Sequence, residues 1–206
     1  LTVSFRAPEN LKATLTQNGL ALTVDATALY ETYYKVFFGD SNNVTPIPFK
    51  TFIEGQPITY TYAKAGTYDV KVVALSGGAA SSELVKTIKV GKQIDLPIGF
   101  DDVNYDYTFG DFGGAASSIA ADPADAANKV MKVVKTAGAE VWAGTTMSTA
   151  LGLAKAIPLK SGASTMQARV YSPAAGITVK LKVEDHANGN IAVETDAVTT
   201  VANAWE

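Results

Sequence analysis

The sequence contains no cysteine and a single histidine, His186, among its 206 residues. The lack of cysteine excludes disulfides, thiolate nucleophiles and zinc sites built from thiolates. One histidine cannot supply a site that needs two imidazole groups, and it argues against triad-type nucleophilic catalysis.

Other features are missing as well. Lys and Arg total 17 against 20 for Asp and Glu, so the net charge is -3 and there is no basic stripe to favour nucleic acid. No apolar run approaches the length of about 18 residues that would predict a transmembrane helix. The sequence has no Gly-x-Ser-x-Gly, no P-loop and no His-Glu-x-x-His motif, and we therefore predict that it is not an enzyme.

The residues that are present predict an all-β protein. Two segments, 34–40 and 60–72, alternate large apolar and polar side chains with a period of two and contain Gly-Asp or Ala-Gly turns. This pattern is typical of strand, tight turn and strand in an immunoglobulin-like β-sandwich. Further alternating segments lie at 11–15, 20–24 and 84–90, and Pro46 and Pro48 indicate a loop or a short edge strand.

The two segments also carry a family resemblance. The run Phe37-Phe38-Gly39-Asp40, followed by Tyr-Ala-Lys-Ala-Gly-Thr-Tyr-Asp-Val at 62–70, resembles the polycystic-kidney-disease (PKD) domain over roughly residues 7 to 90. The resemblance implies an Ig-type sandwich. In bacteria it also implies a non-catalytic spacer or adhesion unit in secreted proteins that handle polysaccharides.

A short linker, Gly91-Lys92-Gln93, divides the chain into two expected domains, residues 1–91 and 95–206. Residues 1–5 already alternate like a strand, so we expect the chain to begin inside a longer precursor with neighbouring domains. Strands of the second domain are predicted at 130–135, 140–144, 166–171, 177–183 and 191–195.

The second domain resembles jelly-roll carbohydrate-binding-like modules of Bacteroidetes surface glycan-binding proteins and of laminarinase-associated proteins. The segments that carry this resemblance are 96–102, 107–114, 141–144, 170–173 and 179–184. In such modules a final strand normally follows the Trp-Glu pair found here at 205–206, so the resemblance implies a β-sandwich that lacks its last strand.

Aromatic residues of the second domain are candidates for stacking on sugars, since flat rings pack on the apolar face of a pyranose. Trp142 is the first candidate, beside small residues that leave room for a ligand, although a packed core position is the alternative. Tyr107 belongs to an aromatic cluster that forms either a binding lip or a strand alternating into the core; its other members are Tyr105, Phe109 and Phe112. Trp205 is expected in the core.

Polar candidates follow from the alternation of two predicted strands. Gln167 and Arg169 point to one side of 166–171, and Lys182 and Glu184 point to one side of 177–183. If the two strands pair, these four residues share a polar face that could bind sugar hydroxyls. The alternative is a solvated face with cross-strand salt bridges.

The resemblance also implies a structural Ca²⁺ near Asp101, with Asp102 beside it, although the sequence has no Asp-x-Asp-x-Asp-Gly loop. The Glu-x-Asp-x-x-Glu motif of laminarinase-type enzymes is absent, and with it the pair of carboxylates that cleaves a glycosidic bond.

These observations predict non-catalytic capture of an extracellular polysaccharide, with a β-glucan such as laminarin as the ligand that the resemblance favours. The chain would then lie at the bacterial surface, as part of an outer-membrane lipoprotein or secreted protein working with an outer-membrane glycan-uptake complex. A structural or adhesive stalk is one alternative, and an accessory region of a larger secreted glucanase is another.

Overall fold

The computed structural model describes residues 6–147, 151–162 and 164–206. These residues form thirteen β-strands, as the all-β prediction required, and within them no helix could span a lipid bilayer. The chain divides into two compact units. The first unit comprises residues 1–93 and 102–106, and the second comprises 94–101 and 107–206. The predicted boundaries at 91 and 95 lie beside this division, but the segment 102–106 belongs to the first unit.

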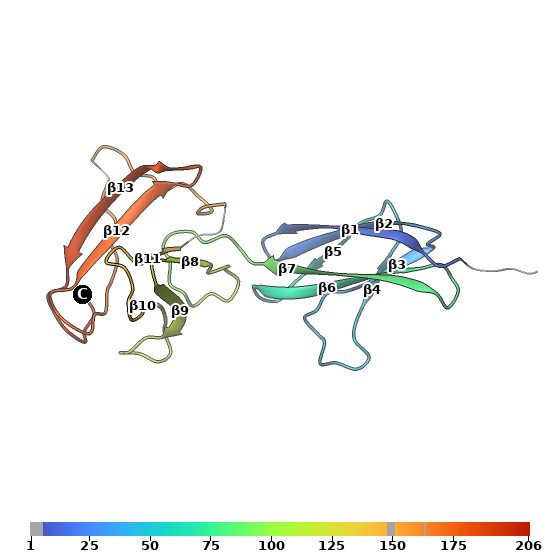
Figure 1. The fold of residues 1–206 in the computed structure, drawn as a ribbon, viewed down its shortest axis with the longest axis horizontal. Helices are drawn as coiled ribbons and strands as arrows, with labels where there is room; N and C mark the ends of the chain where they lie inside the picture. Colours follow the sequence, from blue (N-terminus) through green and yellow to red (C-terminus); the bar gives the residue numbers. More distant parts are fainter. Residues whose placement is uncertain (1–5, 148–150, 163) are drawn as a thin grey trace, which may run out of the picture. The chain divides into compact units, whose positions relative to one another are not determined.

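The first unit is an immunoglobulin-like sandwich of two antiparallel sheets that face each other (Figure 1). One sheet has the order β1-β2-β5, formed by β1 (Glu9–Asn18), β2 (Ala21–Leu29) and β5 (Ile58–Thr61). The other has the order β4-β3-β6-β7, formed by β4 (Lys50–Phe52), β3 (Tyr33–Phe37), β6 (Gly66–Leu75) and β7 (Ser81–Val90). The predicted strands of this unit are therefore confirmed, and β4 is the short edge strand that follows the two prolines.

The core of the first unit lies between these sheets and follows from the alternation of the strands. Inward positions of both sheets are almost fully buried, among them Leu22, Val24, Tyr34, Val36, Val70 and Val72. Each such side chain contributes about 1.5–3 kcal/mol when it leaves water, so the alternating pattern itself determines which face of each strand is buried.

The turn after β3 explains why glycine stands in the Phe-Gly-Asp motif. Gly39 has a φ of 80°, and a Cβ atom built on it would lie 2.6 Å from the backbone oxygen of Asp69 on β6. Beside this contact, the Tyr62 hydroxyl donates to the backbone carbonyl of Phe38 at 2.9 Å, and the Phe38 ring stacks on Tyr60 with centroids 4.1 Å apart. The motif therefore fixes a close approach between two strands of the same sheet.

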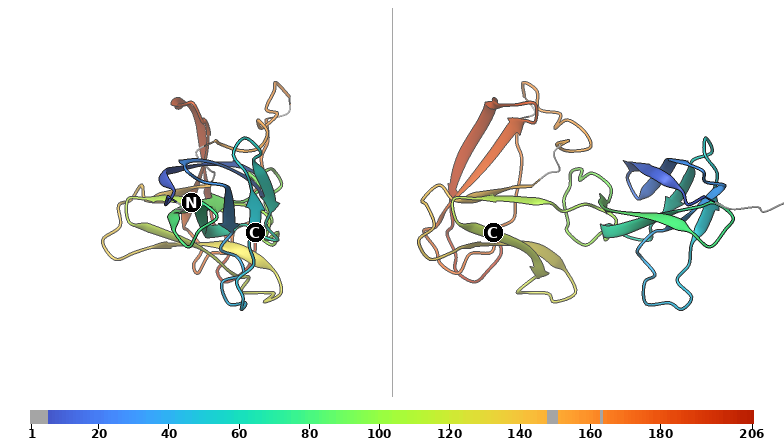
Figure 2. Two further views of the ribbon diagram at one scale, coloured as in Figure 1. Left: turned by 90° about the vertical axis from the view of Figure 1, so that its right-hand side faces the viewer. Right: turned by 45° about the vertical axis from the view of Figure 1, so that its right-hand side comes forward.

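The second unit contains three antiparallel strand pairs among its described residues. They are β8 (Phe109–Phe112) with β11 (Gly144–Met147), β9 (Ala115–Ala121) with β10 (Lys129–Lys135), and β12 (Thr178–Asp185) with β13 (Asn188–Val198). Figure 2 shows β12 and β13 as a two-stranded ribbon. The strands predicted at 130–135, 177–183 and 191–195 are thus confirmed, whereas a jelly roll stays a prediction.

Two predicted strands of the second unit are wrong. Residues 140–143 form a turn, and β11 begins only at Gly144. The segment 166–171 forms no strand apart from a bridge between Tyr171 and Trp205, next to two backbone hydrogen bonds that join Val170 and Glu206. Alternation alone does not make a strand, because the backbone also needs a partner along its whole length.

Candidate functional site

Trp142 lies in a turn, where its side chain is 62% exposed. The Ala143 amide donates to the Glu140 carbonyl at 3.0 Å and closes this turn. The Glu140 amide donates to the carbonyl of Gly113 at 2.8 Å, which ties the turn to the connection between β8 and β9. The core alternative for Trp142 is therefore wrong, because the indole is held at the surface.

A second ring lies beside this indole. Phe112, at the end of β8, is 44% exposed, and its ring is nearly parallel to that of Trp142, with 6.2 Å between centroids and 14° between planes. We call these two side chains the aromatic surface. Rings presented in this way can pack against the apolar face of a sugar.

Two glycines make this arrangement possible. A Cβ atom on Gly113 would lie 2.7 Å from the Trp142 ring, and one on Gly144 would lie 2.9 Å from the Phe112 ring. Phe112 and Gly144 are direct partners in the ladder of β8 and β11. Each ring therefore lies across bare backbone, which limits its freedom to turn away from the surface.

Arg169 and Trp205 belong to a different group of side chains. The Arg169 guanidinium lies 5.3 Å from the centre of the Trp205 ring, and Tyr171 meets that ring edge-on at 5.6 Å. The indole nitrogen of Trp205 donates to the buried carboxylate of Asp122 at 2.9 Å. A hydrogen bond from the Ala124 amide, with further ones from Asn128 and Trp205, lowers the pKa of Asp122. Trp205 is half-buried and has a structural role, as its predicted core position implied.

The predicted shared polar face is wrong, because β12 pairs with β13 and the segment that contains Gln167 and Arg169 does not join this ladder. Lys182 and Glu184 do lie on one face of β12, where their charged groups are 2.7 Å apart. That pair lies within one strand, and the cross-strand salt bridge of the alternative is made on the same face by Lys180 and Glu194 of β13, 2.8 Å apart. Gln167 is exposed on a segment without strand structure.

Tyr107 is half-buried, with its ring 5.4 Å from that of Phe100, which favours the packed alternative over a binding lip. Asp101 accepts a hydrogen bond from the Lys129 amide at 2.8 Å. Asp102 accepts one from the Asn104 amide at 2.9 Å, and that bond is the main cause of its lowered pKa. Each of these carboxylates therefore anchors backbone within its own unit.

No group of three or more His, Cys, Asp or Glu residues within 6–147, 151–162 and 164–206 is arranged to hold a metal ion. The predicted Ca²⁺ at Asp101 and Asp102 stays a prediction, and each of the two carboxylates already accepts a backbone hydrogen bond.

Sequence reasoning placed Phe112 in an aromatic cluster but did not pair it with Trp142. The available signal was a glycine close to each ring in the sequence, Gly113 after Phe112 and Gly144 after Trp142, although each glycine lies under the other ring. Nothing in the sequence gave the register that sets Phe112 opposite Gly144.

Comparisons with known proteins add little to this geometry. No family model matches the chain, and no curated protein matches it. Among solved structures, the chain is similar to the PKD1 domain of the Vibrio cholerae metalloprotease PrtV, with 24% identity and a TM-score of 0.34. That match covers 42% of this chain and 100% of the PKD1 domain.

Proposed function

We propose that the chain is a non-catalytic module that binds extracellular polysaccharide through the aromatic surface of Phe112 and Trp142. The observation that carries the proposal is the pair of exposed, nearly parallel rings held over glycine backbone. The absence of a glycosidase motif from the sequence is in keeping with binding without chemistry. Ring stacking with a few hydrogen bonds corresponds to dissociation constants from about 1 mM to about 1 μM.

A β-glucan such as laminarin is the ligand that we test first, on the basis of the sequence resemblance. In the same proposal the chain lies outside a bacterial cell, as part of a surface or secreted protein with further domains and an outer-membrane uptake complex as partners.

Affinity gel electrophoresis tests the proposal directly. The chain is run through gels that contain laminarin or other neutral glucans, and retardation measures binding. Trp142→Ala and Phe112→Ala should each restore most of the free mobility. Val141→Ala is the matched control, because Val141 is 92% exposed in the same turn but is no part of the aromatic surface. Retention that survives Trp142→Ala contradicts the proposal.

A structural spacer is the second candidate, and a specific observation favours it. Arg169, Lys182, Glu184 and Tyr107, four of the predicted binding residues, are engaged in contacts inside the second unit. A folded chain that is retarded by no polysaccharide in a broad panel would support the spacer and contradict the binding module.

A further inference from the structure

The outer face of the four-stranded sheet in the first unit carries an unusual set of side chains. Because Tyr34 and Val36 point into the core, the alternation of β3 sends Tyr33, Lys35 and Phe37 to the outer face. Thr51 of the neighbouring strand β4 lies on the same face, where it is the ladder partner of Lys35. Strand β4 also forms one wall of a hollow.

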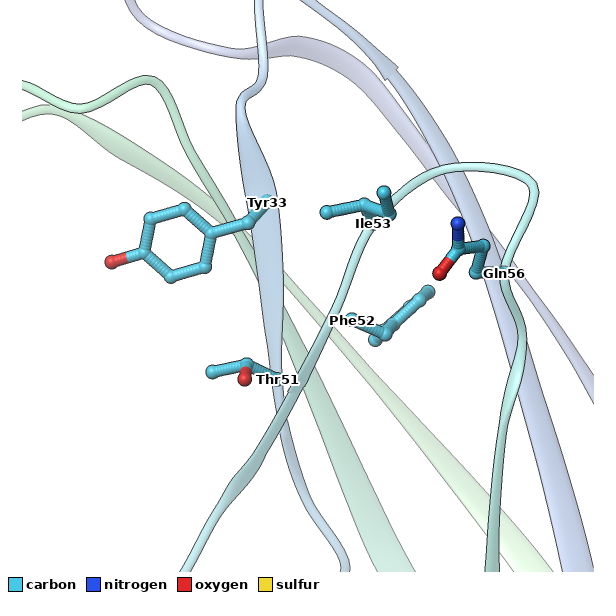
Figure 3. A pocket seen from close by; sticks show the side chains of 5 residues that line it. All are labelled: Tyr33, Thr51, Phe52, Ile53 and Gln56. Carbon is cyan, nitrogen blue, oxygen red and sulfur yellow. The ribbon is translucent and has the colours of Figure 1, made fainter.

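The hollow has a volume of about 370 Å³ and is open to solvent. Figure 3 shows the five side chains that line it, with Tyr33 on β3 and the others on β4 and the segment that follows it: Tyr33, Thr51, Phe52, Ile53 and Gln56. Phe52 is buried and stacks on Tyr34 with centroids 4.9 Å apart. One side of the hollow is therefore part of the packed core and does not collapse easily.

Gln56 is positioned by a tight turn. Its amide donates to the Ile53 carbonyl at 3.1 Å, and Gly55, the third residue of the turn, has a φ of 76°. A positive φ at the third position is what a type II turn requires. The sequence Glu-Gly before Gln56 therefore holds its side chain at the end of β4.

The polar groups of the hollow are not used inside the protein. Among residues 6–147, 151–162 and 164–206, the Tyr33 hydroxyl, the Thr51 hydroxyl and the Gln56 carboxamide have no hydrogen-bond partner. These groups stand beside the ring of Tyr33 and the exposed side chain of Ile53. An aromatic ring, an aliphatic wall and uncharged hydrogen-bonding groups together match the two faces of a sugar.

A lysine on the same outer face, Lys35, is the ladder partner of Thr51, which lines the hollow. The Lys35 ammonium is 4.7 Å from the centre of the Phe49 ring, and it has no ion-pair partner among the described side chains. Lys71, on the same face, differs because Glu83 lies 3.8 Å from its ammonium. An ammonium held over a ring and left without a carboxylate favours a ligand with a negative charge.

We propose that this hollow binds one residue of an anionic glycan, a sugar that carries a carboxylate or sulfate group. The sugar packs against Tyr33 and Ile53, its hydroxyls bond to Thr51 and Gln56, and its anionic group faces Lys35. The inference extends the proposed function, since it involves the same broad class of ligand, but it depends on different residues in a different unit.

Isothermal titration calorimetry of the whole chain with a short oligogalacturonate, which carries carboxylates, tests the inference. A second titration with a sulfated galactan oligosaccharide shows whether the hollow binds sulfate or carboxylate more tightly. A neutral laminarin oligosaccharide, titrated into Trp142→Ala so that the aromatic surface is disabled, is the uncharged comparison. We expect a dissociation constant of about 1 mM or tighter for at least one anionic probe, and a loss of about tenfold in Tyr33→Ala and in Lys35→Gln. Raised salt should weaken the binding in the native chain and much less in Lys35→Gln.

Lys12→Gln is the matched charge control, because Lys12 is exposed on β1 in the other sheet of the same unit. It should bind the anionic probe like the native chain, and so should Trp142→Ala, which separates this site from the aromatic surface. No heat with either anionic probe overturns the inference. So does a loss in Lys12→Gln equal to that in Lys35→Gln, or equal binding of neutral and anionic probes to Trp142→Ala. Circular dichroism of each variant establishes that it is folded.

Discussion

Replacing Gly39 by alanine tests how the Phe-Gly-Asp motif stabilises the first unit. Gly39 has a φ of 80°, a conformation that costs a residue with a Cβ atom about 1–2 kcal/mol. The new methyl group would also lie 2.6 Å from the backbone oxygen and 3.0 Å from the backbone nitrogen of Asp69. Backbone atoms of a central strand cannot move aside as a flexible side chain can, and overpacking of this kind costs about 1–3 kcal/mol.

Gly55 provides a matched control in the same unit. Its φ is 76°, but a Cβ atom there would meet nothing within 4 Å. Alanine also lowers the conformational entropy of the unfolded chain, and this effect offsets about 0.4–1 kcal/mol of the loss of stability in both variants. We therefore expect Gly55→Ala to lower the free energy of unfolding by about 1 kcal/mol, and Gly39→Ala to lower it by about 2–4 kcal/mol.

Urea unfolding measures the two losses. Both tryptophans, Trp142 and Trp205, belong to the second unit, so tryptophan fluorescence follows that unit. The stacked tyrosines of the first unit contribute to the near-ultraviolet circular dichroism, and the part of that signal that does not change with tryptophan fluorescence reports the first unit. Equal losses for Gly39→Ala and Gly55→Ala would refute the reasoning, because the close approach to Asp69 would then contribute nothing.

Three further outcomes follow from the structure. Tyr62→Phe removes a hydroxyl that donates to the backbone carbonyl just after β3, and it should cost the first unit about 1–2 kcal/mol in urea unfolding. Trp205→Phe removes the hydrogen bond to Asp122, and it should lower the urea midpoint of the second unit while the Trp142 signal remains to report it. A hydrogen bond to Asp40, with burial, raises the pKa of Tyr60 from 10.0 to about 12. The unfolded chain loses the Tyr60 proton at a lower pH than the folded chain, so the raised pKa contributes fully to the free energy of unfolding below pH 10.0. This contribution is lost as the pH rises toward about 12, and circular dichroism across an alkaline titration would detect the loss.

The fold of the first unit could be predicted because its pattern is local. Its strands largely alternate, so Tyr34 and Val36 on β3, with Val70 and Val72 on β6, identify the buried face without knowledge of the pairing. The hydrophobic effect then leaves few ways to join two such sheets. The short strand β4 shows where this reasoning stops, because three residues carry too little pattern to predict a strand.

The second unit shows the opposite case. Residues 166–171 alternate as well as any strand of the first unit, but among the described residues their backbone meets a partner only near Tyr171. Trp142 stands between Val141 and Ala143 in what resembles a strand, yet it lies in a turn fixed by hydrogen bonds to Glu140 and from Glu140 to Gly113. Both errors have the same cause. Whether a segment forms a strand depends on a partner segment that is distant in the sequence, and the local pattern of side chains carries no information about that partner.

Whether a side chain can belong to a binding site depends on the contacts that it makes in the folded protein. Residue type alone therefore could not locate a site. Arg169 was a sound candidate by chemistry, but folding placed its guanidinium over the Trp205 ring. Lys35 also lies over a ring, that of Phe49, but it is the ladder partner of Thr51, which lines the hollow. The difference between the two lies in their neighbours, which the sequence specifies only through the whole fold. Candidate sites in such sandwiches are therefore better sought from the neighbours of a side chain in the folded protein than from its residue type alone.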